Sequence, residues 1–326
     1  MVSKIKSKLS LIAKLSIATI LIVYLVKSGH LDPKGLWELM SARNVALALA
    51  LVGTNVFLAA YRWIILLRAR DFVIGIGYGF SLYLIGIFFN YALPGAVGGD
   101  VVRGYYLVGD YPQRRLDSVL SIVIDRVLGL YSFFILTLIA VVWDFEFVSS
   151  HDQIRWVAAS CAVVFMALTL FFTVAFSQRL SRLVGLEWVG TRIGIVQRLL
   201  EAFQLYGRKK SIIALSVLVS LMAQIVTMVF FYQLAMISGE TGVTWKAIMF
   251  AVPMGFLVTA IPIAPAGIGV GQVAFLYLFQ AYLQQPTQFG AQAITAFQLV
   301  SVCWAIVGAF FYLKRRKPKE LETATP

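Results

Sequence analysis

Long apolar runs separated by short polar segments recur along the whole chain. A helix needs about 20 apolar residues to cross the roughly 30 Å hydrocarbon core of a bilayer, and most of the runs approach or exceed that length. The pattern therefore predicts an all-α, polytopic integral membrane helix bundle. The predicted apolar helices are residues 9–26, 45–67, 74–93, 119–143, 157–176, 212–237, 247–261, 268–283 and 291–313.

The composition agrees with a membrane protein. Apolar residues make up 60% and charged residues 13% of the 326 residues, with a mean hydropathy of +0.85, whereas a soluble domain is about half apolar and a quarter charged. The net charge of +13 comes mainly from basic residues beside the apolar runs. We therefore expect anionic lipid headgroups as partners, and no nucleic acid. Cys161 and Cys303 lie within apolar runs and are expected to be buried.

Basic residues cluster in some loops and are sparse in others, which predicts the orientation because cytoplasmic loops concentrate Lys and Arg. Lysines near the start of the chain and "KRRKPK" from Lys314 place both termini in the cytoplasm, so we expect a multi-pass protein of the inner (cytoplasmic) membrane. The first run lacks a cleavage site and is expected to stay as a helix. Residues 1–313 form a single transmembrane domain, followed by a basic tail, 314–326.

Two segments are expected to form re-entrant hairpins. Residues 68–71 and 110–115 are both basic, so the chain between them enters and leaves by the same face; its return arm, near 96–109, spans only about 21 Å as a helix. The stretch 247–283 lies between two weakly charged loops and behaves likewise from the opposite face. The predicted turn residues are Pro94, Gly95, Gly98 and Gly99 in the first hairpin and Pro262, Pro265, Gly267, Gly269 and Gly271 in the second.

Two hairpins in related positions are typical of an inverted-repeat transporter. The pseudo-repeat halves are about 1–177 and 211–313, joined by an amphipathic cytoplasmic connector, 178–210, of one or two helices. This arrangement predicts about six full spans and two re-entrant hairpins. The alternative is eight or nine simple spans that Pro and Gly merely kink.

Five charged residues fall within apolar runs: Arg62, Asp100, Arg103, Asp125 and Arg126. A charge at the bilayer centre costs roughly 3 kcal/mol on insertion scales, so it normally faces a partner or a cavity. Asp100 and Arg103 are three residues apart and can pair on a helix. Asp125 and Arg126 point about 100° apart and are expected to have different partners.

These charges have a functional and a structural interpretation. Three arginines oriented by carboxylates would bind an anionic headgroup such as a phosphate. Alternatively, Arg62 extends to the interface, while the other charges neutralise one another and join helices. Evidence for an enzyme is weak: His30 and His151 lie far from any carboxylate cluster, and no dinucleotide-binding or nucleophile-elbow motif occurs. We expect no catalytic residue, no metal and no cofactor.

Four motifs in order resemble the UPF0104 membrane family, which is similar to the flippase half of lysylphosphatidylglycerol synthases. They are "YRWIILLRA" from Tyr61, "LPGAVGGDVVRGYYL" from Leu93, "VIDRVLGL" from Val123 and "PAGIGVGQVAF" from Pro265. Gln272 stands where the family usually has an acid. The resemblance implies a protein that carries a lipid headgroup between leaflets. The residues expected to bind substrate are Arg62, Asn90, Asp100, Arg103, Asp125, Arg126 and Gln272.

The leading hypothesis is therefore a flippase-like transporter for a lipid or a lipid-linked headgroup. One alternative is a membrane-embedded transferase acting on lipid-linked substrates, with Asp100 or Asp125 as general base. Another is an accessory scaffold for an envelope-lipid enzyme, so a glycosyl transferase or an envelope-lipid enzyme is a possible partner.

Overall fold

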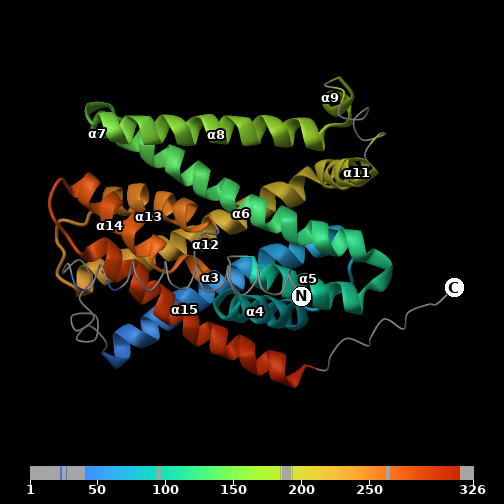
Figure 1. The fold of residues 1–326 in the computed structure, drawn as a ribbon, viewed down its shortest axis with the longest axis horizontal. Helices are drawn as coiled ribbons and strands as arrows, with labels where there is room; N and C mark the ends of the chain where they lie inside the picture. Colours follow the sequence, from blue (N-terminus) through green and yellow to red (C-terminus); the bar gives the residue numbers. More distant parts are fainter. Residues whose placement is uncertain are drawn as a thin grey trace, which may run out of the picture.

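A computed structural model describes residues 41–93, 97–183, 194–261 and 265–315, together with Val23, Lys27, Gly185 and Arg192. Throughout this part the chain is helical and contains no strand (Figure 1). The helices are α3 (Ala42–Ala69), α4 (Ile76–Ala92), α5 (Gly98–Asp110), α6 (Arg115–Trp143), α7 (Phe145–Ser150), α8 (Asp152–Phe176), α9 (Gln178–Leu183), α11 (Gly194–Arg208), α12 (Lys210–Ile237), α13 (Trp245–Thr259), α14 (Val270–Leu283) and α15 (Phe289–Lys314).

The described residues confirm an all-α membrane bundle. Five helices are long and apolar enough to cross a bilayer: α3, α6, α8, α12 and α15. The helices α4, α13 and α14 are apolar but have only 14 to 17 residues, and α5 has 13. The predicted first span, 9–26, and the predicted turn residues Pro94, Gly95 and Pro262 lie outside the described residues, as does almost all of the tail 314–326.

Helices α4 and α5 form the first hairpin, and both of its ends lie at the same end of the bundle. The Tyr111 hydroxyl donates to the carbonyl of Val73 at 2.8 Å, and the Arg114 guanidinium donates to the carbonyl of Arg70 at 2.6 Å. Lys209, just before α12, donates to the carbonyl of Ala69 at 2.6 Å. We call the place where these residues meet the arginine-rich end.

Helices α13 and α14 form the second hairpin, whose ends lie at the opposite end of the bundle. Lys246 at the start of α13 and Tyr282 near the end of α14 both contact Asp144, which follows the last residue of α6. With 29 residues, α6 is about 43 Å long and separates the two hairpin mouths (Figure 1). The two predicted hairpins are therefore present and open toward opposite ends of the bundle, and their arms are shorter than the five helices that could cross a bilayer.

The glycines expected in the hairpin turns play two different roles. Gly267 and Gly269 lie in the turn and have positive φ angles of 69° and 85°, which glycine adopts without strain. Gly98, Gly99 and Gly271 instead lie in the first turns of α5 and α14. There, close packing explains the missing side chain: a Cβ on Gly99 would lie 1.9 Å from the carbonyl oxygen of Gly86 on α4.

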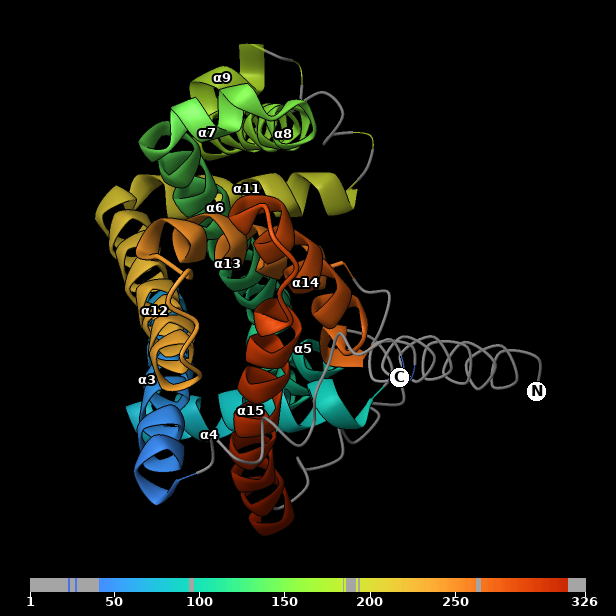
Figure 2. The same cartoon turned by 90° about the vertical axis from the view of Figure 1, so that its left-hand side faces the viewer.

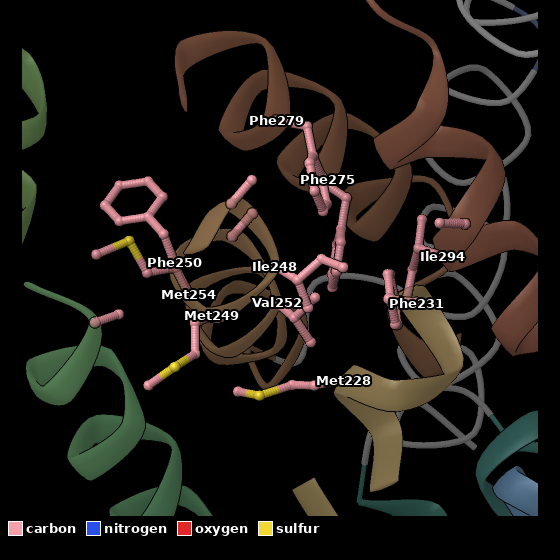
Figure 3. Packing of buried hydrophobic residues seen from close by; sticks show 14 of the residues in the cluster. Met228, Phe231, Ile248, Met249, Phe250, Val252, Met254, Phe275, Phe279 and Ile294 are labelled. Carbon is pink, nitrogen blue, oxygen red and sulfur yellow. The ribbon is translucent and has the colours of Figure 1, made fainter. Parts of the chain in front are cut away.

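The largest apolar core surrounds the second hairpin (Figure 3). Phe231 of α12, Phe250 of α13 and Phe275 of α14 are almost completely buried there. Helix α15 packs against both hairpins through glycines: a Cβ on Gly290 would meet the carbonyl oxygen of Phe275 at 2.2 Å, and one on Gly308 would meet that of Leu84 at 2.0 Å. Figure 2 shows α15 passing close to both hairpins.

Helices α7, α8 and α9 lie on one side of the molecule in both ribbon views. Most of the apolar surface of α8 is exposed, as expected for a helix that faces lipid. The described part of the connector includes α9 and α11, and Phe203 of α11 packs against Phe172 and Phe176 of α8. The prediction that both cysteines are buried is wrong: Cys303 is exposed and Cys161 is intermediate, because each lies on an outward face of its helix.

Candidate functional site

The five intramembrane charges meet in one cluster, although they come from three helices. Arg62 lies on α3, Asp100 and Arg103 on α5, and Asp125 and Arg126 on α6. Asp125 lies roughly 15 Å along α6 from its start. Asp100 and Arg103, on the return arm of the first hairpin, lie at the same depth as Asp125. In a surface loop, these two charged residues would lie at the membrane interface.

The side chains alternate in sign along a continuous series of ion pairs. Arg62 Nε lies 2.7 Å from Asp125 Oδ1, and the Arg103 guanidinium lies 3.3 Å from the other oxygen of that carboxylate. Arg103 also lies 2.9 Å from Asp100 Oδ1, and Arg126 lies 2.5 Å from Asp100 Oδ2. We call this series the ionic chain. The expectations that Asp100 pairs with Arg103, and that Asp125 and Arg126 have different partners, agree with this geometry.

The inner and outer parts of the ionic chain differ in burial. The side chains of Arg62, Asp125 and Arg103 are 9%, 3% and 4% exposed, whereas Asp100 is 18% and Arg126 is 32% exposed. Three arginines against two aspartates leave a formal charge of +1. The inner part of the ionic chain is buried. Its outer part, the Asp100–Arg126 pair, reaches the accessible surface.

Arg103 occupies the centre of the chain and is also held by aromatic rings. Its guanidinium carbon lies 4.4 Å from the ring centroid of Trp63 and 4.9 Å from that of Tyr83, which are favourable cation–π distances. The Trp63 indole is completely buried and donates to the Ser121 hydroxyl at 3.2 Å. The buried Nε of Arg103 has no hydrogen-bond partner.

Arg62 points into the bundle and does not extend to the membrane interface. Besides Asp125, it donates to the Ser220 hydroxyl of α12 at 2.8 Å. Gly129 on α6 leaves space for its guanidinium, because a Cβ there would lie 3.1 Å from Nη1. The alternative that Arg62 reaches the interface is therefore wrong, because the partners of its charged end are inside.

The outer pair of the ionic chain is flanked by apolar side chains that face outward. Val101 and Tyr105 on α5 are 65% and 64% exposed, and Val123 on α6 is 42% exposed. Val101 directly follows Asp100 in α5, and Val123 lies three residues before Arg126 in α6. A polar headgroup bound by Arg126 would thus have apolar surface beside it for a lipid chain.

Asn90 is a support for the cluster because it fixes the tip of the first hairpin. Its side-chain oxygen accepts a hydrogen bond from the Gly99 amide at 2.9 Å. That amide is in the first turn of α5, one residue before Asp100. Asn90 therefore positions the helix turn that carries Asp100.

Gln272 belongs to a separate polar cluster at the tip of the second hairpin. Its oxygen accepts from the Gly269 amide at 2.7 Å, and its nitrogen donates to Thr295 and Gln298 at 3.1 and 2.7 Å. The side chain is 1% exposed, and these bonds use its acceptor and both of its donors. Asp100 and Gln272 are each the third residue of a return helix, yet one joins an ionic chain and the other fastens a turn.

Sequence reasoning missed Trp63, Tyr83 and Ser220, which complete the surroundings of Arg62 and Arg103. Trp63 directly follows Arg62 in a motif singled out for its arginine, which is a signal that could have identified it. Ser220 gives no such signal, because a lone serine in an apolar helix resembles any packing residue. Within the described residues, no group of three or more His, Cys, Asp or Glu side chains is arranged to hold a metal ion.

Comparisons with known proteins agree with the motifs. A family model described as the lysylphosphatidylglycerol synthase TM region matches residues 11–309. A UPF0104 membrane protein of Methanothermobacter thermautotrophicus is 24% identical over 290 residues, which cover 82% of this chain and 84% of that protein. No solved structure matches the chain.

Proposed function

Because the chain belongs to the lysylphosphatidylglycerol synthase transmembrane-region family, we propose that it is a flippase-like carrier that moves a lipid, or the headgroup of a lipid-linked molecule, across the cytoplasmic membrane. The family is one of membrane proteins connected with lipid metabolism, which supports a lipid as the substrate. The class of headgroup follows from the charges of this chain.

The observation that carries the proposal is the ionic chain. Buried ion pairs that only join helices need matched charges, because an unmatched buried charge is costly. Of the five side chains in the ionic chain, three are basic and two are acidic, and Arg126 is the most exposed of the five. This arrangement favours an anionic headgroup, such as a phosphate, as the group that binds at Arg126.

Binding would add a phosphate to the partners of Arg126 and leave the existing ion pairs in place. Arg126 has five N–H donors in a planar fork that matches phosphate oxygens, so it can hold a phosphate while it still contacts Asp100. Asp100 would keep its bond with Arg103. The inner pairs at Asp125 would then stay intact and hold α3, α5 and α6 together as the headgroup passes.

We propose a carrier and not an enzyme. The carboxylates of Asp100 and Asp125 each contact two arginines, so neither is placed to accept a proton from a substrate hydroxyl as a general base. No specific observation favours the transferase or the scaffold alternative.

We also propose that the arginine-rich end faces the cytoplasm. Arg70, Arg114 and Lys209 lie there, whereas the basic side chain seen at the mouth of the second hairpin is Lys246. Cytoplasmic loops concentrate basic residues. On this orientation, the first hairpin enters from the cytoplasmic side and the second from the outer side.

The test is headgroup movement in proteoliposomes that contain fluorescent phosphatidylglycerol. We expect Arg126→Gln and Asp100→Asn to slow flipping by about tenfold or more, because each removes a charge-assisted bond worth roughly 1.5–3 kcal/mol. Arg126→Lys should retain part of the rate, since it keeps the charge and loses the fork.

The matched controls are Arg155→Gln and Asp152→Asn. Arg155 and Asp152 form an exposed pair on α8, with side chains 54% and 80% exposed. Both variants should flip lipid at the unaltered rate. Unchanged flipping by both Arg126→Gln and Asp100→Asn would show that the ionic chain is not the substrate site.

A further inference from the structure

The mouth of the first hairpin is closed by three side chains. Tyr78, near the start of α4, donates its hydroxyl to Asp110, the last residue of α5. Arg315, directly after α15, binds the same carboxylate oxygen. The Arg315 guanidinium carbon also lies 5.0 Å from the Tyr78 ring centroid. The triad Tyr78–Asp110–Arg315 therefore ties both arms of the first hairpin to the end of a helix from the second half of the chain.

The mouth of the second hairpin is closed by the same three kinds of group. Lys246, the second residue of α13, lies 3.3 Å from Asp144 Oδ1, and Tyr282 of α14 donates its hydroxyl to the other carboxylate oxygen. Asp144 follows directly after α6. The triad Tyr282–Asp144–Lys246 therefore ties both arms of the second hairpin to the end of a helix from the first half.

The two triads are related in a way that chance packing does not explain. Each combines an aspartate, a tyrosine and a cation. Each fastens one hairpin at its open end, and each does so to a spanning helix of the other half, so the two ties are reciprocal. They lie at opposite ends of α6, and aromatic rings pack beside both: Tyr106 lies 4.9 Å from the Arg315 guanidinium carbon, and Phe147 lies 4.4 Å from the Tyr282 ring.

We propose that the triads are two latches that open alternately, one at each membrane face. Their exposure fits this role. Asp110 and Lys246 are 31% and 47% exposed, and their partners Arg315 and Asp144 are each 18% exposed, so water can reach both pairs when a triad opens, and partly exposed pairs are weak. Water cannot replace a lost partner in the buried inner part of the ionic chain, so those ion pairs stay formed. Opening one latch therefore releases one hairpin mouth from the spanning helix of the other half, without separating α3, α5 and α6 at the centre.

Both latches are closed in this structure, so both hairpin mouths are fastened. Opening the first latch would expose the first hairpin at the arginine-rich end, and opening the second would expose the other hairpin at the opposite end. The assignment of these movements to lipid transport rests on the function proposed above. The latches themselves can be tested without any transport measurement.

The test is hydrogen–deuterium exchange of the full chain in nanodiscs. We expect Asp110→Asn to raise the exchange rate of amides in α4 and α5 roughly two- to fivefold, as loss of an exposed pair implies, while α13 and α14 keep their rates. Asp144→Asn should give the reverse pattern. Tyr78→Phe and Tyr282→Phe should show the same exchange patterns more weakly. They replace the aspartate variants in this test if an aspartate variant fails to fold.

A charge exchange separates a latch from general destabilisation. Asp110→Arg alone should raise exchange in the first hairpin, and combining it with Arg315→Asp should lower it again. Asp152→Asn, in the exposed pair on α8, should change neither hairpin. The proposal is overturned if neither aspartate variant changes exchange, or if each raises exchange equally in both hairpins. If the aspartate variants change hydrogen–deuterium exchange as expected but flip lipid at the unaltered rate, the latches exist and have no role in transport.

Discussion

At the scale of single residues, Asp125 is the most constrained position in the ionic chain. Its carboxylate contacts both Arg62 and Arg103, and its side chain is 3% exposed. Asp100 performs a similar task for Arg103 and Arg126 where it is more exposed. The two aspartates therefore have similar partners but different access to water, and this difference separates stability from substrate binding.

We expect Asp125→Asn to lower the free energy of unfolding by about 3–5 kcal/mol, because it removes the carboxylate that Arg62 binds and leaves Arg103 with Asp100 alone. Asp100→Asn should cost clearly less, since its carboxylate is partly solvated. Both can be measured by reversible unfolding in mixed micelles, followed by tryptophan fluorescence. Equal losses for the two variants would contradict the distinction between a dry inner part and an accessible outer part.

At the scale of elements, the first hairpin depends on the close approach of its two arms. Gly99 of α5 packs directly on the backbone of α4 at Gly86, and Asn90 of α4 caps the Gly99 amide. This contact places the first turn of α5 beside α6. Asp100 and Arg103 can then pair with Arg126 and Asp125. Packing between backbones here decides whether the ionic chain can form.

We expect Gly99→Ala to destabilise the protein by about 1–3 kcal/mol or more, because its Cβ would lie 1.9 Å from a backbone oxygen and helices must separate to accept it. Gly77→Ala on α4 is the matched control, since a Cβ there meets nothing within 4 Å. Thermal unfolding in detergent should distinguish the two. A Gly99→Ala protein as stable as Gly77→Ala would mean that the arms do not pack this closely.

At the scale of the whole molecule, the two ends differ in charge. Arg70, Arg114, Lys209 and Arg315 meet at one end, where they bind carbonyl groups or aspartates of neighbouring helices. Lys246 is the basic side chain of the triad at the other end. Because cytoplasmic loops concentrate basic residues, this difference predicts the direction in which the bundle inserts, and hence which hairpin each compartment meets.

We expect the arginine-rich end to be cytoplasmic, because basic loops are retained on that side. In a variant with both cysteines replaced by serine, Lys246→Cys should react with an impermeant maleimide on intact spheroplasts. Lys210→Cys should react only after the membrane is opened. The reverse pattern would invert the orientation and exchange the compartments assigned to the two latches.

Much of the fold could be predicted from the sequence because its signals are local. The lengths of apolar runs predicted the spans, and loop charges predicted two opposed hairpins that the structure contains. The cost of charge within the membrane selected Arg62, Asp100, Arg103, Asp125 and Arg126, all of which meet in one cluster. Side-chain polarity and position in an apolar run were sufficient for that selection.

The pairing of these charges required the tertiary structure. The bond of Arg62 with Asp125 joins residues 63 positions apart, and its bond with Ser220 joins residues 158 apart. The two latches join Asp110 to Arg315 and Asp144 to Tyr282 across 205 and 138 positions. Gln272 was expected to bind substrate together with Asp100, and in the structure it accepts a hydrogen bond from the Gly269 amide of its own turn. The sequence by itself determined where polar groups sit within each helix and how deep they lie. Only helix packing, in which backbones approach at glycines, decided which of those groups meet.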